Sequence, residues 1–220
     1  MYLIFDTETT GLVNSKLPPA HSSQPNLVQL GALLMSSEHE VVAELGCIVQ
    51  PQGWKIPAVV ADIHGITTEH ATKHGLPAAA VCQLFRAMAS QASCYVCHNI
   101  RFDMSILETF ATRQGQLSPF KASCRQICTM QATTDICQLP GRITGSYKWP
   151  KLQEAHKYYF GVEFDKAHSA LADVRATSRI LFEMEKRGHI ILGSAETAQI
   201  QLRPLILPEA PALAEAAVLV

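Results

Sequence analysis

The chain has 220 residues, a length typical of a single domain rather than a multidomain protein. Apolar residues make up 48% of it and charged residues only 17%, below the roughly 25% of an average protein, which excludes a disordered chain. Because 18 basic residues balance 19 acidic ones, no overall positive field draws the chain to nucleic acid or membrane. A polyanionic partner must therefore be held locally.

The N-terminus and the cysteines indicate the compartment. Asp6 and Glu8 lie where an export signal needs an apolar run, and no stretch offers about 18 uninterrupted apolar residues. The odd number of seven cysteines, several of them in apolar runs, favours buried thiols over disulfides. We therefore expect a cytoplasmic protein with no membrane segment.

The first quarter of the chain predicts an antiparallel meander. Short apolar runs at 1–5, 27–35 and 41–51 have the composition of strands, and the first ends near Asp6 to Glu8. Residues 13–26 collect Pro, Ser and Asn without periodicity, which predicts a loop.

Helices and strands alternate after the meander. Pro57 precedes a short helix, and Pro77 opens a longer one. Its predicted core-facing stripe consists of Val81, Leu84, Phe85 and Met88. The remaining predicted elements are a strand at 93–99, a helix at 103–115, a strand at 125–130, and helices at 150–160 and 169–187.

This order predicts an α/β domain with a mixed, five-stranded central sheet flanked by helices. We place the domain at residues 1–187. Residues 188–220 are rich in Pro and Ala and lack a clear period, so we expect a C-terminal tail that is either docked or flexible.

Two acids end the first strand. Asp6 and Glu8 are two residues apart, so in a strand they project from one face, roughly 6 to 7 Å from each other, which suits a shared cation. An Asp-x-Glu pair is expected by chance in a chain of this length, so the pair alone indicates only a polar strand end.

Three further candidates lie at later element boundaries. Asp103 follows the 93–99 strand, whose end should lie beside that of the first strand, although an acid at a helix start is common. His168 and Asp173 are five residues apart, and five helical steps leave them about 140° apart. They converge only if His168 precedes the helix, with Ser169 as its N-cap.

Taken together, five segments resemble the DEDDh (DnaQ-like) exonucleases, the group that contains the epsilon-type proofreading subunits of bacterial replicative DNA polymerases. They are FDTETTGL at 5–12, HGIT at 64–67, HNIRFD at 98–103, CTM at 128–130 and HSALADV at 168–174, all in family order. The resemblance implies a ribonuclease-H-like fold and 3′-to-5′ removal of nucleotides.

The resemblance also implies a role for each candidate. Two Mg²⁺ or Mn²⁺ ions would be held by Asp6, Glu8, Asp103 and Asp173, and His168 would be the general base. Two such ions about 3.5 to 4 Å apart can stabilise the attacking and leaving oxygens of an in-line displacement at phosphorus. Oxygen ligands favour these hard cations over zinc, and hydrolysis would release nucleoside 5′-monophosphates.

By the same resemblance, the pocket for the terminal nucleotide would comprise Thr9, Leu12, His64, Asn99 and Phe102. Ordinary core packing explains Leu12 and Phe102 equally well.

The segment 141–159 interleaves cations with aromatic residues: Arg142, Lys148, Lys151 and Lys157 with Tyr147, Trp149, Tyr158 and Tyr159. Cations can bind phosphates and aromatic rings can stack on bases, so the segment is a candidate for tracking a nucleic acid strand. A solvated helix face with Trp149 turned inward explains it about as well.

A haem-attachment pattern occurs at Cys94, Cys97 and His98. We expect no haem, because the three residues lie in or next to an apolar strand of a chain without an export signal. A zinc site combining Cys94 and Cys97 with Cys124 and Cys128 is less favoured than buried thiols.

Single-stranded DNA is the favoured substrate. An RNA-trimming 3′-to-5′ exoribonuclease is the main alternative, because contacts to a 2′-hydroxyl are not readable from these motifs. A nucleic-acid-binding module without turnover is a third interpretation, but all five catalytic positions are filled. A polymerase or sliding clamp is a candidate partner, because residues 201–205 faintly resemble clamp-docking peptides.

Overall fold

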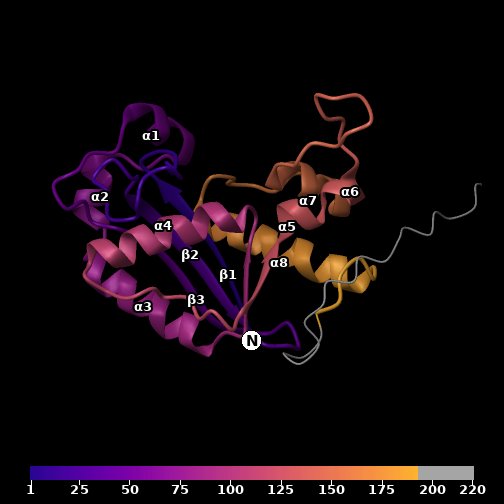
Figure 1. Cartoon of the computed structure of the whole chain (residues 1–220), viewed down its shortest axis with the longest axis horizontal. Helices are drawn as coiled ribbons and strands as arrows, with labels where there is room; N and C mark the ends of the chain where they lie inside the picture. Colours follow the sequence, from indigo (N-terminus) through magenta and orange to yellow (C-terminus); the bar gives the residue numbers. More distant parts are fainter. Residues whose placement is uncertain (193–220) are drawn as a thin grey trace, which may run out of the picture.

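The computed structural model describes residues 1–192 (Figure 1). Of the expected tail, residues 188–192 are described, and Ile190 and Leu192 pack into the core. The rest of the tail, including the clamp-like run at 201–205, lies outside the described residues. No helix among the described residues is long and apolar enough to cross a membrane.

Five strands form one mixed sheet, as the sequence predicts, and their order in it is β3-β2-β1-β4-β5. They are β1 (Tyr2–Thr9), β2 (Leu27–Met35), β3 (Val41–Ile48), β4 (Cys94–Cys97) and β5 (Arg125–Cys128). The first three pair antiparallel, whereas β4 runs parallel to β1 and to β5. The carboxyl ends of β1, β4 and β5 therefore lie at one edge of the sheet.

Eight helices occur in the described part of the chain: α1 (Ala58–His64), α2 (Thr68–His74), α3 (Ala78–Gln91), α4 (Ile100–Arg113), α5 (Thr129–Ala132), α6 (Thr134–Cys137), α7 (Leu152–Phe160) and α8 (Ala170–Lys186). The sequence predicts all of them except α2, α5 and α6. These are too short to show a helical period, although Thr67 caps α2 by accepting a hydrogen bond from the His70 N–H.

Helices cover both faces of the sheet (Figure 1). On one face, α3 and α4 pack on the β1 side chains Leu3 and Phe5. On the other face, α7 and α8 pack on Tyr2 and Ile4. Because successive strand residues alternate, Asp6 and Glu8 follow Ile4 toward the α8 face, and Thr7 follows Phe5 toward the α4 face.

One predicted packing detail and one of the two interpretations of residues 141–159 are wrong. Leu84 of α3 is exposed, and the buried face of that helix follows Val81, Cys82, Phe85 and Ala89 instead. Trp149 is not turned inward, because 62% of it is exposed.

Candidate active site

The carboxyl end of β1 extends beyond its parallel neighbour. The pairing of β1 with β4 covers only Tyr2 to Ile4, so residues from Asp6 onward have an open edge on that side. Asp6 and Glu8 are both partly buried there, in phase on the α8 face. Because β4 is short, side chains from the α4 side and from the α8 side of the sheet can both approach the end of β1.

Asp103 reaches this edge from α4. Asn99 has a left-handed backbone (φ 82°) that turns the chain directly from β4 into a helix beginning at Ile100, so Asp103 lies in the first turn. Its side chain is only 2% exposed. The Thr7 N–H and Oγ1–H both donate to Asp103 Oδ1, at 3.0 and 2.8 Å, which fixes this carboxylate against β1.

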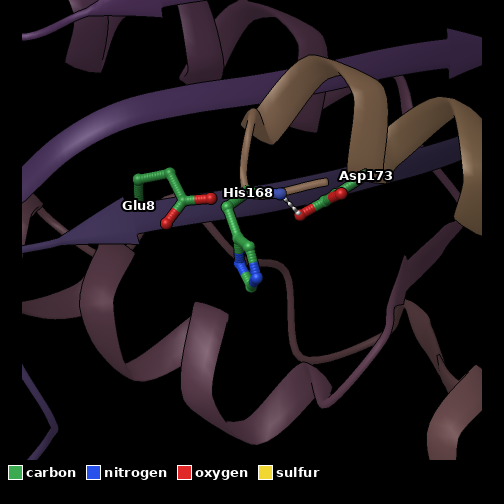
Figure 2. Close-up of side chains that lie close together, drawn as sticks. All are labelled: Glu8, His168 and Asp173. Carbon is green, nitrogen blue, oxygen red and sulfur yellow. Dashed lines mark hydrogen bonds between the residues drawn. The ribbon is translucent and has the colours of Figure 1, made fainter. Parts of the chain in front are cut away.

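His168 and Asp173 converge as the spacing predicts. His168 precedes α8 with φ 66°, and its N–H donates to Asp173 Oδ2 at 3.2 Å (Figure 2). Ser169 occupies the N-cap position, but its side chain makes no capping bond. The turn is therefore closed by Asp173 rather than by the predicted serine cap.

Glu8 joins this pair across the sheet edge. One carboxylate oxygen of Glu8, one ring nitrogen of His168 and one carboxylate oxygen of Asp173 all lie within 4.8 Å of one another. In Figure 2 His168 lies between Glu8 and Asp173, and Asp173 is on α8. The charge of Asp173 contributes to the raised pKa of both Asp6 and Asp103, so these two carboxyl groups also lie near it.

Strand β2 positions the start of α8. Gln29 Oε1 accepts a hydrogen bond from the Ala170 N–H at 2.9 Å. At Gly31, a Cβ atom would lie 2.4 Å from the carbonyl carbon of Ala170, so only glycine permits this approach. The contact brings the first turns of α8, and with them Asp173, against the sheet.

In the absence of a cation, the pKa of each of the four carboxyl groups is raised above its ordinary value. Burial, followed by the three neighbouring carboxylates, raises the pKa of Asp6 well above its ordinary value. Burial and the charges of Asp173 and Asp103 raise the pKa of Glu8 to about 8. Burial raises the pKa of Asp103 to about 7, although the Thr7 hydrogen bonds oppose it, and raises that of Asp173 to about 6.

These residues fit a hard divalent cation. Asp173 Oδ1 is buried without a hydrogen-bond partner, so a strong acceptor atom faces the site unused. Carboxylate oxygens are the ligands that Mg²⁺ and Mn²⁺ prefer, and a cation would stabilise the ionised forms that burial and neighbouring carboxylates disfavour here.

The five predicted nucleotide-binding residues differ in their surroundings. Leu12 is 86% exposed on the loop after β1, so core packing does not explain it. Phe102 is half-buried against the α4-side core, and Asn99 is exposed at the start of α4. Thr9 is buried, and its hydroxyl donates to the Gly11 carbonyl at 2.7 Å, so it shapes the turn rather than facing solvent.

His64 ends α1 beside the site. Its Nδ1 accepts a hydrogen bond from the Ile66 N–H at 3.1 Å, whereas Nε2 is buried without a partner. Burial lowers the pKa of His64; the backbone of Thr9 opposes this shift, and the charge of the neighbouring His168 adds to it. A neutral ring with Nδ1 as acceptor carries its proton on Nε2, so a donor is available there.

Sequence reasoning missed the part played by His98. Its Nδ1 lies 3.0 Å from Thr129 Oγ1 and its Nε2 lies 2.9 Å from the Pro150 carbonyl, and burial lowers its pKa to about 4. His98 is therefore a neutral link between the end of β4 and two later segments. Cys94 and Cys97 are buried in β4, as the sequence predicts.

The geometry of this site agrees with a match at the family level. The family model RNase_T, described as exonuclease, matches residues 3–181. The chain belongs to this DnaQ-like exonuclease family. The match confirms the family that the motifs predict and identifies an exonuclease domain, a hydrolase of phosphodiester bonds in nucleic acid.

Two curated relatives illustrate the range of the family. The uncharacterized exonuclease CP81 of Escherichia phage 186 is 31% identical over 197 residues, which cover 84% of this chain and 89% of that protein. DNA polymerase III PolC-type of Streptococcus thermophilus is 29% identical over 182 residues, or 82% of this chain. The chain spans only 11% of the length of that polymerase.

Solved structures confirm the ribonuclease-H-like fold. The crystal structure of E. coli exonuclease I with a dT13 oligonucleotide has a TM-score of 0.69 at 22% identity, covering 84% of this chain and 41% of that one. At this identity the likeness shows the fold alone.

Proposed function

We propose that the chain is a metal-dependent 3′-to-5′ exonuclease that releases nucleoside 5′-monophosphates from single-stranded DNA. The observation that carries the proposal is the convergence of four carboxylates with raised pKa values and one imidazole at the open end of β1. The exonuclease family match supports the reaction, and the oligonucleotide bound to the similarly folded exonuclease I supports a single-stranded substrate.

The site would hold two Mg²⁺ or Mn²⁺ ions. Asp6, Glu8 and Asp173 would bind one of them, and Asp103 would bind the other, with Asp6 shared between the two. When bound, the ions would supply positive charge next to the attacking and leaving oxygens. A zinc-bound form of exonuclease I shows that the same fold also accepts zinc in that protein.

We assign His168 the role of general base. Its ring lies on an exposed loop beside Glu8 and Asp173, where an imidazole can take a proton from water at working pH. The hydrogen bond from its own N–H to Asp173 fixes the backbone that carries the ring. Asp173 thus serves as an acceptor that orients this turn as well as a proposed metal ligand.

The residues around this cluster would hold the terminal nucleotide. Exposed Leu12 can contact a base, and the Nε2–H of His64 can donate to a phosphate or sugar oxygen. Thr9, Asn99 and Phe102 complete the proposed pocket through the backbone of the β1 end and the start of α4.

Digestion of single-stranded DNA, duplex DNA and RNA, each labelled at the 3′ end, tests the proposal with Mg²⁺ and with Mn²⁺. We expect mononucleotide release to be fastest from single-stranded DNA and to stop in EDTA. Faster release from RNA would assign the chain to RNA trimming instead. Binding without release from any substrate would leave only a nucleic-acid-binding module.

Two variants test the residue roles. His168→Ala should lower kcat far more than it weakens binding of DNA, and unchanged turnover would remove His168 from the mechanism. Mg²⁺ should raise the melting temperature of the wild type but raise that of Asp6→Ala much less. An equal rise in both would place the cations elsewhere.

We propose a replicative DNA polymerase as the partner. The support is the match to a segment of DNA polymerase III PolC-type. Co-sedimentation of the purified chain with a bacterial DNA polymerase III tests the proposal, and separate sedimentation would contradict it.

A further inference from the structure

Residues 139–150, which we call the arm, form a hairpin that projects beyond α6 and α7 (Figure 1). Its own backbone holds it together: the Gly141 N–H donates to the Ser146 carbonyl at 2.8 Å, and the Lys148 N–H donates to the Leu139 carbonyl at 2.9 Å. The arm is thus a preformed feature of the fold, so binding a partner would cost its backbone little further conformational entropy.

The base of the arm is fixed to the rim of the candidate site. His98, which ends the β4 segment, bonds through Nε2 to the carbonyl of Pro150, the last residue of the arm. Asn99 and the helix that carries Asp103 begin directly after His98. A second attachment is the ion pair between Lys148 and Glu154 on α7. The arm therefore rises from the same edge of the sheet at which the acids converge.

The exposed side chains of the arm include two aromatic residues, a free cation and Ile143. Tyr147 and Trp149 are exposed, and Trp149 shows 62% of its surface, although tryptophan is usually among the more buried residues. Arg142 of the arm and Lys151, which directly follows it, are also exposed, and neither forms an ion pair with any residue in 1–192. An exposed aromatic pair bordered by free cations is typical of a binding surface.

The local charge selects the kind of partner. Residues 139–159 contain four basic residues and one acidic residue, Glu154, whereas the whole chain has a net charge of −1. This excess of positive charge suits a polyanion, and the aromatic rings suit stacked bases. A protein partner would need matching acids, whereas a nucleic acid strand supplies both features along its length.

We propose that the arm binds the upstream part of the strand whose 3′ end occupies the active site. Tyr147 and Trp149 would stack on bases before the terminal nucleotide, and Arg142 and Lys151 would bind phosphates. The proposal rests on the proposed exonuclease function. The arm would supply affinity for the strand, which the near-neutral net charge of the molecule does not provide.

The dependence of hydrolysis on substrate length tests the proposal. A thymidine dinucleotide is too short to reach from the active site to the arm, whereas dT12 is long enough to contact both. We expect Trp149→Ala and Arg142→Glu to raise KM for dT12 about tenfold, with kcat and the dinucleotide KM changed less than about twofold. Trp149→Phe should keep most of the affinity, because phenylalanine still stacks. The control, Lys186→Glu on the last turn of α8, should leave both substrates unchanged.

Equal losses on the two substrates, or no loss on either, would overturn the proposal. Wild-type protein that hydrolyses neither substrate would instead overturn the proposed function, and binding then decides the role of the arm. The chain has two tryptophans, so Trp54→Phe leaves Trp149 as the only one.

In EDTA, which prevents metal-dependent turnover, dT12 should quench Trp149 fluorescence saturably in this variant. Adding Arg142→Glu should reduce the slope of log Kd against log salt by about 0.7, the value for one phosphate contact on a single strand. Unquenched fluorescence on saturation with dT12 would overturn the proposal and would leave the arm as a protein-docking surface.

Discussion

The hydrogen bonds from Thr7 to Asp103 allow a quantitative test of the site. Thr7→Val keeps the shape and the β propensity of the side chain but removes the hydroxyl that donates to Asp103 Oδ1 at 2.8 Å. The backbone N–H at 3.0 Å remains. The variant therefore removes one of two donors that stabilise the ionised form of a buried carboxylate.

The size of the effect follows from the energy of that hydrogen bond. A hydrogen bond to a charged group contributes about 1.5 to 3 kcal/mol, which corresponds to a rise of about 1 to 2 in the pKa of Asp103. The wild-type pKa is about 7. Because metal binding requires the ionised form, Thr7→Val should weaken Mg²⁺ binding roughly 5- to 50-fold at pH 7 but only about twofold or less at pH 9.

Calorimetric titration with Mg²⁺ at the two pH values measures this difference directly. Thr7→Ser keeps a hydroxyl and serves as the matched control, so its affinity should stay near that of the wild type at both. The reasoning is refuted if Thr7→Val binds Mg²⁺ as tightly as wild type at pH 7, or if its loss persists undiminished at pH 9.

Three further predictions concern the scaffold of the site. Gly31→Ala should lower the free energy of unfolding by about 3 kcal/mol and abolish most activity, because the new Cβ meets the backbone of Ala170. In the control Gly46→Ala, the new Cβ meets only a flexible leucine side chain, so the loss should be about 1 kcal/mol. Equal losses of the two variants in urea unfolding would contradict this reasoning. Burial raises the pKa values of the site acids, that of Glu8 to about 8, so without metal the native state binds more protons than the unfolded state between about pH 4 and pH 8. The melting temperature in EDTA should therefore fall as the pH rises through this window. A melting temperature that rises there would show that these acids are not buried together. Arg113→Ala should lower the free energy of unfolding in urea by about 2 to 4 kcal/mol, because the guanidinium donates hydrogen bonds to four backbone carbonyls and one side chain of the loop between β1 and β2. Arg113→Lys should restore less than half of this lost free energy.

Local rules predict the parts of the fold that depend on local periodicity. The strand alternation places Asp6 and Glu8 on one face, and the 100° step of a helix requires His168 to precede α8. Both expectations agree with the structure because neighbouring residues along the chain determine them. The apolar stripe predicted for α3 is wrong at Leu84, because a stripe does not say which of its borders meets the core, and Leu84 is at the exposed border.

Local periodicity does not predict the contacts between segments that are distant in the sequence. Thr7 lies on the opposite face from Asp6 and Glu8, so a search for acids passes over it, although it determines the state of Asp103. The partners of His98 are 31 and 52 residues away, in segments whose path no local pattern gives. Its sequence neighbours suggested a haem motif instead.

Gly31 shows how such a contact transmits position to the site. In a central strand, glycine lacks a side chain to pack and weakens the sheet, so the sequence alone makes Gly31 look unfavourable. In the fold, the missing Cβ lets the backbone at Ala170 lie against β2, and Asp173 follows one helical turn later. The same approach sets where His168 stands relative to Glu8. The residue that costs stability in its own strand is therefore what allows α8 to deliver two of the five site residues to β1.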